Sequence, residues 1–211
     1  MFDYRNAKPM KETEWTRVYE VGGWMCHESK FMTDSLKVSA ESIKARWPTF
    51  SIGEKLDFAQ AFSRAREVTP ENERILDFLM EAGDFNVWMS ITGPLRHHRD
   101  KDRVLAFLLE RVKAEDVPKG NFFQSLGLMN DKRALPALRA ACDSYRELLS
   151  TRPASRAGGE PFDYDYLDYL HCCEALWKIS GSLEYKQVIE EALKSQDDDV
   201  RNTAGLLLRN A

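Results

Sequence analysis

The sequence predicts an all-α fold, a right-handed α-solenoid of about five helical hairpins behind an irregular N-terminal cap. Segments of helix length are separated by short breaks that contain Pro, Gly, Asp or Asn. Alternating apolar and polar runs with β-branched residues, the pattern of a strand, do not recur. The closing segment, 197–211, begins with aspartates that suit a helix N-terminus and then places Val200, Ala204 and Leu207 on one helical face.

The elements follow from the positions of these breaks. Helices are expected at 33–46, 51–66, 70–82, 84–95, 99–114, 118–129, 131–150, 162–180, 182–195 and 197–210. Residues 1–32 contain several aromatic residues and a Gly-Gly turn, and they are expected to form an irregular cap with one helix at most. The predicted domains are therefore a cap segment, 1–32, and a repeat domain, 33–211, with an insertion at 151–162.

An internal repeat becomes visible when the breaks are aligned. In each copy an apolar helix ends, a tight polar turn follows and the next helix begins. Clear copies lie at 126–138 and 176–189, and a weaker copy lies at 88–109. Because one hairpin cannot bury its apolar face alone, neighbouring hairpins are expected to stack.

The segment 128–138, LMNDKRALPAL, and the Asp-Val-Arg opening of the last helix resemble the HEAT-repeat family, in particular its short lyase-type HEAT-like repeats. The resemblance covers 84–211 well and 33–82 loosely. In that family a proline bends the first helix, and an Asp and an Arg tie neighbouring repeats together. The matching positions in this sequence are Pro136, Asp199 and Arg201.

Length and composition are those of an ordinary globular chain. The 211 residues suit one compact domain or a short repeat array, and hydrophobic and charged residues make up 43% and 30% of them. No apolar run approaches the roughly 18–20 residues of a membrane span. The first residues carry acids and no apolar core segment, so we expect no secretory signal and a cytoplasmic location.

The cysteines and histidines are candidates for a metal site or a reactive thiol, but their spacing favours neither. The four cysteines lack regular spacing, and we expect them to be reduced, mostly buried residues, with Cys173 in the core. The adjacent His97 and His98 diverge on a helix and are flanked by arginines, so a solvated helix end is favoured over a metal site. No metal or other cofactor is expected.

Motifs of catalysis are also missing from the sequence. It contains no glycine-rich phosphate loop, no Gly-x-Ser-x-Gly and no His-Glu-x-x-His. Carboxylate pairs such as Asp197 and Asp199 are expected to be helix caps before they are acid–base pairs. The sequence therefore predicts that the protein is not an enzyme.

The insertion at 151–162 runs directly into an acidic, tyrosine-rich segment. A dozen residues stand where two or three would close a turn, which is typical of a disordered tip or a functional loop. One interpretation of the following segment is a helix N-terminus with two tyrosines packed inward. The other is a partner-binding surface, because tyrosine gives large contact area and carboxylates attract a basic protein. Its candidate residues are Asp163, Tyr164, Asp165, Tyr166, Asp168 and Tyr169.

Charge adds to the second interpretation. Residues 157–211 hold 11 acids and 5 bases, a net −6, whereas the rest of the chain has a net charge of +2. The expected function is non-enzymatic protein binding, and a specific version is an immunity protein that neutralises a basic toxin through the acidic tyrosine-rich face. The partner is expected to be a protein with a basic surface. The net charge of −4 disfavours nucleic acid, and no membrane contact is expected.

The resemblance also implies two enzymatic alternatives, a HEAT-like DNA glycosylase and a bilin lyase. A glycosylase needs a basic groove, and the isoelectric point near 5.7 weighs against one. A local basic run nevertheless comprises Arg96, Arg99, Lys101, Arg103, Arg111 and Lys113. The sequence has no marker for a bilin lyase. It does not separate an immunity protein from a regulatory subunit, and it leaves the oligomeric state open.

Overall fold

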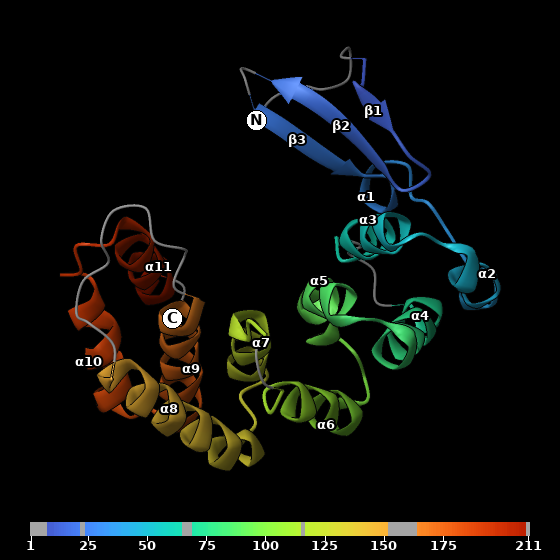
Figure 1. Cartoon of the computed structure of the whole chain (residues 1–211). Coiled ribbons are helices and arrows are strands. Elements are labelled where there is room, and N and C mark those ends of the chain that lie inside the picture. Colours follow the sequence, from blue (N-terminus) through green and yellow to red (C-terminus); the bar gives the residue numbers. More distant parts are fainter. Residues whose placement is uncertain (1–7, 22–23, 65–68, 115–116, 152–163, 210–211) are drawn as a thin grey trace. The chain divides into compact units, whose positions relative to one another are not determined.

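A computed structural model describes residues 8–21, 24–64, 69–114, 117–151 and 164–209. The chain divides into two compact units, Met1–Arg99 and Asp100–Ala211. Both are built mainly from helices, and the first also contains a small sheet (Figure 1). None of the described helices combines the length and the apolar character that crossing a membrane requires.

The N-terminal segment corrects the expectation of an irregular cap. It forms an antiparallel sheet of three strands in the order β1-β2-β3, which span Lys11–Glu12, Thr16–Val21 and Trp24–Ser29. The register pairs Thr16 with Ser29 and Val18 with His27. Strand alternation is blurred here because the adjacent residues Val18 and Tyr19 are both buried. The sequence nevertheless carried a hairpin signal, since two glycines separate β2 from β3.

The rest of the first unit is helical. Its helices are α1 (Lys30–Thr33), α2 (Ala40–Arg46), α3 (Ile52–Phe62), α4 (Pro70–Ala82) and α5 (Phe85–Leu95), with a 3-10 turn at Trp47–Thr49. The predicted helix 33–46 is thus broken between α1 and α2, where Ser35 has a φ of 51°. The other helices of this unit lie within the predicted ranges, and side chains cap the starts of α2, α3, α4 and α5.

An aromatic core joins the sheet to α3. Trp15 packs edge-on against Phe58, with ring centroids 5.0 Å apart, and Phe31 of α1 stacks on Trp15. Phe58 is fully buried. The hydroxyl of Thr16 also donates to the Asp57 carboxylate of α3 over 2.8 Å. The sheet is therefore fixed to α3 by both apolar and polar contacts.

In the described part of the second unit the regular elements are all helices, and each α-helix matches a predicted one. They are α6 (Lys101–Arg111), α7 (Gly120–Met129), α8 (Leu135–Ser150), α9 (Tyr164–Ser180), α10 (Leu183–Ala192) and α11 (Asp198–Arg209), with a 3-10 turn at Lys132–Ala134. Helix α9 lies at the centre of the unit and contacts α7, α8, α10 and α11. Because it has neighbours on most sides, α9 buries residues around most of its circumference, including charged ones.

The closing helix bears out the apolar stripe expected of it. Val200, Ala204 and Leu207 of α11 are all buried. The Asp197 carboxylate accepts the backbone N–H groups of Asp199 and Val200, so this aspartate caps the helix.

The contacts of Arg201, one of the positions that match the HEAT pattern, are with residues close to it in sequence. Arg201 donates to the Ser195 carbonyl and pairs with Asp198, both in the same hairpin, and Asp199 is exposed. Pro136 lies in the first turn of α8, where a missing N–H costs no helical hydrogen bond. The family membership that these positions suggested stays a prediction.

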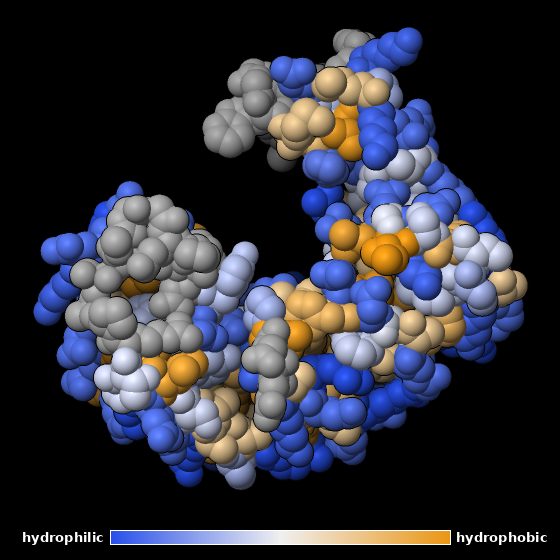
Figure 2. Space-filling model, viewed as in Figure 1, coloured by the Kyte–Doolittle hydropathy of each residue, from blue (hydrophilic) through white to orange (hydrophobic). Residues whose placement is uncertain are grey.

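Figure 2 draws one face of the molecule, on which hydrophilic residues predominate. On the face drawn in Figure 2 they cover most of both units, and hydrophobic residues lie in small separate groups. Isolated groups of this kind are normal on a folded protein. The exposed large hydrophobic residues of the described ranges are Met10, Met25, Met32, Ile52, Leu128, Leu148, Tyr164, Leu183, Leu193 and Leu206.

Candidate functional site

The acidic tyrosine segment lies at the start of α9, but its members face different environments. Tyr164 is 56% exposed, and Asp165 and Tyr166 are half-buried. Asp168 and Tyr169 are buried, at 4% and 8% exposure. The predicted residue Asp163 lies outside the described part of the chain. The outward-facing surface is therefore smaller than the sequence predicted, and whether it binds a partner stays a prediction.

Asp168 holds the start of another helix. Its carboxylate accepts the backbone N–H of Lys119 at 2.6 Å and that of Gly120 at 2.7 Å, and the Tyr145 hydroxyl of α8 donates to it over 3.2 Å. The Lys119 side chain does not cap α7 itself. Asp168 therefore supplies the acceptor that an N-cap residue normally provides, and it connects α7, α8 and α9.

Burial and hydrogen bonding act on this carboxyl in opposite directions. Burial raises the pKa of Asp168 above its ordinary value, while the hydrogen bonds from Lys119, Gly120 and Tyr145 favour the charged form and limit the rise. The same burial, together with the nearby Asp168 charge, raises the pKa of the Tyr145 hydroxyl. Tyr145 therefore stays protonated and remains a donor to Asp168.

Close packing of α7 against α9 depends on glycine. A Cβ atom at Gly120 would stand 2.9 Å from Cδ2 of His171 and 3.2 Å from Oδ1 of Asp168. A Cβ atom at Gly127 would lie 3.0 Å from Cα of Ala175. The absence of side chains at these two positions lets α7 approach closely enough to receive the Asp168 carboxylate.

A second buried carboxylate, that of Glu174, lies six residues further along α9. Glu174 is 1% exposed, with its Oε1 2.8 Å from Nζ of Lys178 and its Oε2 3.8 Å from Nδ1 of His171. Burial alone would raise the pKa of Glu174, but the two neighbours outweigh it and leave this pKa below its ordinary value. This cluster was not predicted from the sequence, although Glu174 and Lys178 have the four-residue spacing of a helical ion pair.

Three of the four cysteines lie in the core, as expected. Cys142, Cys172 and Cys173 are buried where α8 meets α9, and all four cysteines are free. The sulfurs of Cys142 and Cys173 are 4.0 Å apart, and the Cys172 thiol donates to the Leu138 carbonyl. Burial raises the pKa of Cys172, which keeps this thiol protonated and unreactive.

The prediction of a solvated histidine pair holds for one of the two residues. His97 is exposed, as a solvated helix end requires, but His98 is buried with its Nε2 3.4 Å from Oδ1 of Asp77. The expectation that both are solvated is therefore wrong for His98, which α4 covers. Within the described ranges, no group of three or more His, Cys, Asp and Glu side chains is arranged to hold a metal ion.

The predicted basic run is divided between the two units. Arg96 and Arg99 belong to the first unit, and the members from Lys101 onward belong to the second. Arg99 lies against Glu73 of α4, with Nε 3.5 Å from the carboxylate. Nucleic-acid binding by this run stays a hypothesis.

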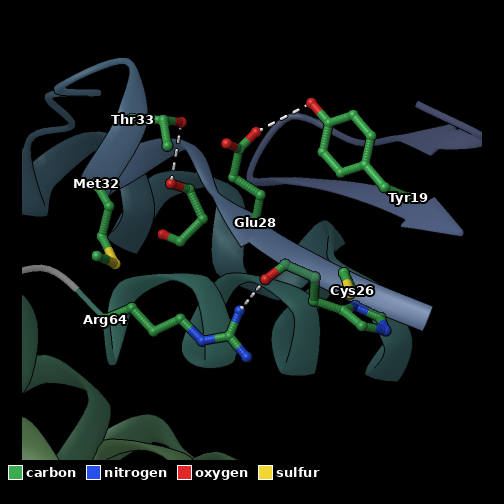
Figure 3. Close-up of a pocket in the computed structure, with 8 residues that line it drawn as sticks. Tyr19, Cys26, Glu28, Met32, Thr33 and Arg64 are labelled. Carbon is green, nitrogen blue, oxygen red and sulfur yellow. Dashed lines mark hydrogen bonds between the residues drawn. The ribbon is translucent and has the colours of Figure 1, made fainter. Parts of the chain in front are cut away.

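A pocket that the sequence analysis did not predict lies beside β3. Its volume is about 230 Å³, and it is lined by Tyr19, Cys26, His27, Glu28, Ser29, Met32, Thr33 and Arg64. Figure 3 shows Tyr19 and Glu28 on one side of β3 and Arg64 approaching the strand from the other side. The Tyr19 hydroxyl donates to Glu28 over 3.1 Å, and Nη1 of Arg64 donates to the His27 carbonyl over 2.7 Å.

Comparisons of the chain with known protein families, with curated proteins and with solved structures find no significant match. The functional argument therefore rests on the residues and geometry of this chain.

Proposed function

We propose that the chain is a non-enzymatic protein-binding protein of the HEAT-like helical-repeat type, and that it contacts a basic partner through the exposed start of α9. The observation that carries this proposal is the placement of Tyr164, which is 56% exposed at the end of a helix whose next turn is buried. An aromatic residue presented on a firmly held helix loses little conformational freedom on binding.

Tyr164 is unusual among the residues of this surface. The other exposed large hydrophobic residues in the described part of the chain are methionines, leucines and an isoleucine. Tyrosine is enriched at protein interfaces because its ring adds apolar contact area and its hydroxyl adds a hydrogen bond. The Asp168 cap and the buried Tyr169 fix the helix turn that follows.

The negative charge of the C-terminal part favours a basic partner. Residues 157–211 carry a net −6. The exposed carboxylates of α10 and α11 include Glu184, Glu190, Glu191, Asp198 and Asp199. Acidic surfaces accelerate the encounter with a basic protein and exclude acidic competitors. A basic toxin neutralised by this chain as its immunity protein is the specific form of the proposal.

Helix packing supports the helical-repeat assignment. Within the first unit α2 packs on α4 and α3 packs on α5, and within the second unit α7 packs on α9 and α9 packs on α11. Contacts between alternate helices are expected where successive hairpins stack. A cytoplasmic location is part of the proposal, and the free cysteines support it because reducing compartments keep thiols reduced. No observation on the described residues favours the glycosylase or the bilin lyase.

Affinity purification from the native host with quantitative mass spectrometry tests the proposal. The baits are the wild type, a double variant with Tyr164→Ala and Asp165→Lys, and a control with Glu41→Lys. The control also replaces an acid in the first turn of a helix by lysine. We expect a basic protein to be enriched by the wild type and the control and lost from the double variant. Equal recovery of every captured protein by all three baits would refute the proposal.

A further inference from the structure

Strand β3 lies at the edge of the sheet, which is drawn in Figure 1. β2 pairs with one side of it, and within the described ranges no strand pairs with its other side. An edge strand exposes a row of backbone N–H and C=O groups that can pair with a further strand. Proteins often block such edges with lysine or proline, but the sequence of β3, WMCHES, contains neither.

The register determines which backbone groups face this open edge. The Lys30 N–H donates to the Trp15 carbonyl, which makes Trp15 and Lys30 a hydrogen-bonded pair in the register of β2 and β3. Hydrogen-bonded and non-hydrogen-bonded pairs alternate along an antiparallel ladder. Val18 and His27 are therefore a non-hydrogen-bonded pair, and the backbone N–H and C=O of His27 point away from β2. The Arg64 guanidinium confirms this direction, because it reaches the His27 carbonyl from outside the sheet.

The pocket described above lies beside these outward-facing groups. The pocket is lined by Cys26 to Ser29 of β3, by Met32 and Thr33 of α1, and by Arg64 after α3. The Ser29 hydroxyl donates to the Ala61 carbonyl over 2.7 Å, which anchors the end of β3 to α3. Met25 and Met32 are 56% and 40% exposed. Flexible thioether side chains of this kind adapt to apolar residues of varied shape.

Arg64 determines which ligand charge the pocket favours. Its side chain is exposed, and its bond to the His27 carbonyl occupies one of the five N–H donors of a guanidinium. The remaining donors lie at the open edge, where they can bind a carboxylate in the bidentate manner that arginine favours. The Glu28 carboxylate also lines the pocket, but Tyr19 and Arg17 already donate to it. An acidic side chain placed next to Arg64 would therefore be selected over a basic one.

We propose that the edge of β3 binds an extended, acidic peptide segment of another protein by strand addition. A peptide carbonyl accepts the outward N–H of His27, and the peptide carboxylate meets Arg64, which keeps its own bond to the His27 carbonyl. Main-chain hydrogen bonds supply affinity in such complexes, and side-chain pockets supply specificity. This site lies in the first unit and does not rest on the function proposed for α9.

Fluorescence polarisation with a labelled peptide, Thr-Val-Ser-Val-Glu-Val-Ser-Val-Thr, tests the site on the full chain. We expect saturable binding with a Kd below about 1 mM and at least about tenfold weaker binding when lysine replaces the peptide's glutamate. A version N-methylated at alternate residues, which removes the pairing N–H groups, should not bind. Absence of saturable binding up to about 1 mM, or equal binding of the N-methylated peptide, would overturn the proposal.

Three protein variants separate backbone pairing from side-chain contact. His27→Pro removes the outward N–H but leaves the ladder to β2 intact, because edge strands tolerate proline at such positions. His27→Ala keeps that N–H. With folding verified by circular dichroism, we expect His27→Pro to lose the peptide and His27→Ala to keep it, while Arg64→Gln removes the preference for glutamate over lysine. Equal binding by His27→Pro, or a wild-type dimer that His27→Pro dissociates in sedimentation, would overturn the proposal, the dimer by assigning the edge to a second copy.

Discussion

The carboxylate of Asp168 accepts the backbone N–H of Gly120 over 2.7 Å and so caps α7 from the middle of the second unit. The two residues are 48 positions apart in the chain. This contact turns a residue that the sequence placed on a binding surface into a structural one, and it fixes the helix that presents Tyr164.

Replacing Asp168 should destabilise the fold. Asp168→Ala leaves the backbone N–H groups of Lys119 and Gly120, at the start of α7, and the Tyr145 hydroxyl without their acceptor. We expect this to cost about 2–3 kcal/mol of unfolding free energy. Asp168→Asn keeps one acceptor oxygen and should cost about 1 kcal/mol. Urea unfolding followed by tryptophan fluorescence measures both. An unchanged free energy in Asp168→Ala would show that this cap does not contribute to stability.

Adding a methyl group at Gly120 should have a similar effect. Gly120→Ala forces the new Cβ against His171 and Asp168, at 2.9 and 3.2 Å, and we expect a loss of about 1–3 kcal/mol. Gly53 is the matched control, because a Cβ there meets nothing within 4 Å in the first turn of α3. Gly53→Ala should stabilise the protein by about 0.5–1 kcal/mol. Thermal melts that rank the two variants in the opposite order would contradict the packing of α7 on α9.

Acid should weaken the second unit through Glu174. The pKa of this carboxyl is lower in the folded protein than its ordinary value of 4.5, because Lys178 and His171 outweigh the effect of burial. Its ionised form therefore contributes stability above about pH 4.5, and that contribution is lost as the pH falls through the lowered pKa. We expect the unfolding free energy of Glu174→Gln to fall less between pH 6 and pH 3 than that of the wild type. Identical pH dependence of the unfolding free energy in the two proteins would show that Glu174 does not contribute to acid destabilisation.

Thiol reactivity should separate Cys26 from the other cysteines. Cys26 is half-buried at the pocket beside β3, whereas Cys142, Cys172 and Cys173 are buried. A chromogenic thiol reagent should therefore modify one thiol rapidly in the native protein and four in denaturant. Cys26→Ser should abolish the rapid phase. Rapid modification of the native Cys26→Ser variant would show that the α8–α9 core is open.

The helices were predictable because their signals are local. Ser51 and Glu54 form a capping box three residues apart, and the apolar stripe of α11 repeats every three to four residues. The sheet was missed because burial of the neighbouring Val18 and Tyr19 obscures the alternation of β2. The Gly-Gly dipeptide at 22–23, between two short runs, is the sequence signal for this hairpin.

The site residues were less predictable because their contacts are long-range. From the sequence, Asp168 is expected to be a solvated acid near a helix N-terminus. Its contact with Lys119, 49 positions away, has no local signal. Arg64 meets the His27 carbonyl across 37 positions, and no local pattern announces that contact. What the sequence did identify was the exposed aromatic at the start of α9, Tyr164, and the acidic character of the chain around it.

Calorimetric titration of the captured partner against the full chain tests the central claim most directly. With the wild type, the account predicts an affinity that falls as salt concentration rises, because opposite charges attract the two proteins. Tyr164→Ala with Asp165→Lys should bind at least about tenfold more weakly, a change of about 1.4 kcal/mol, while Glu41→Lys binds like the wild type. Equal affinities for all three proteins would contradict the claim that the start of α9 is the binding surface.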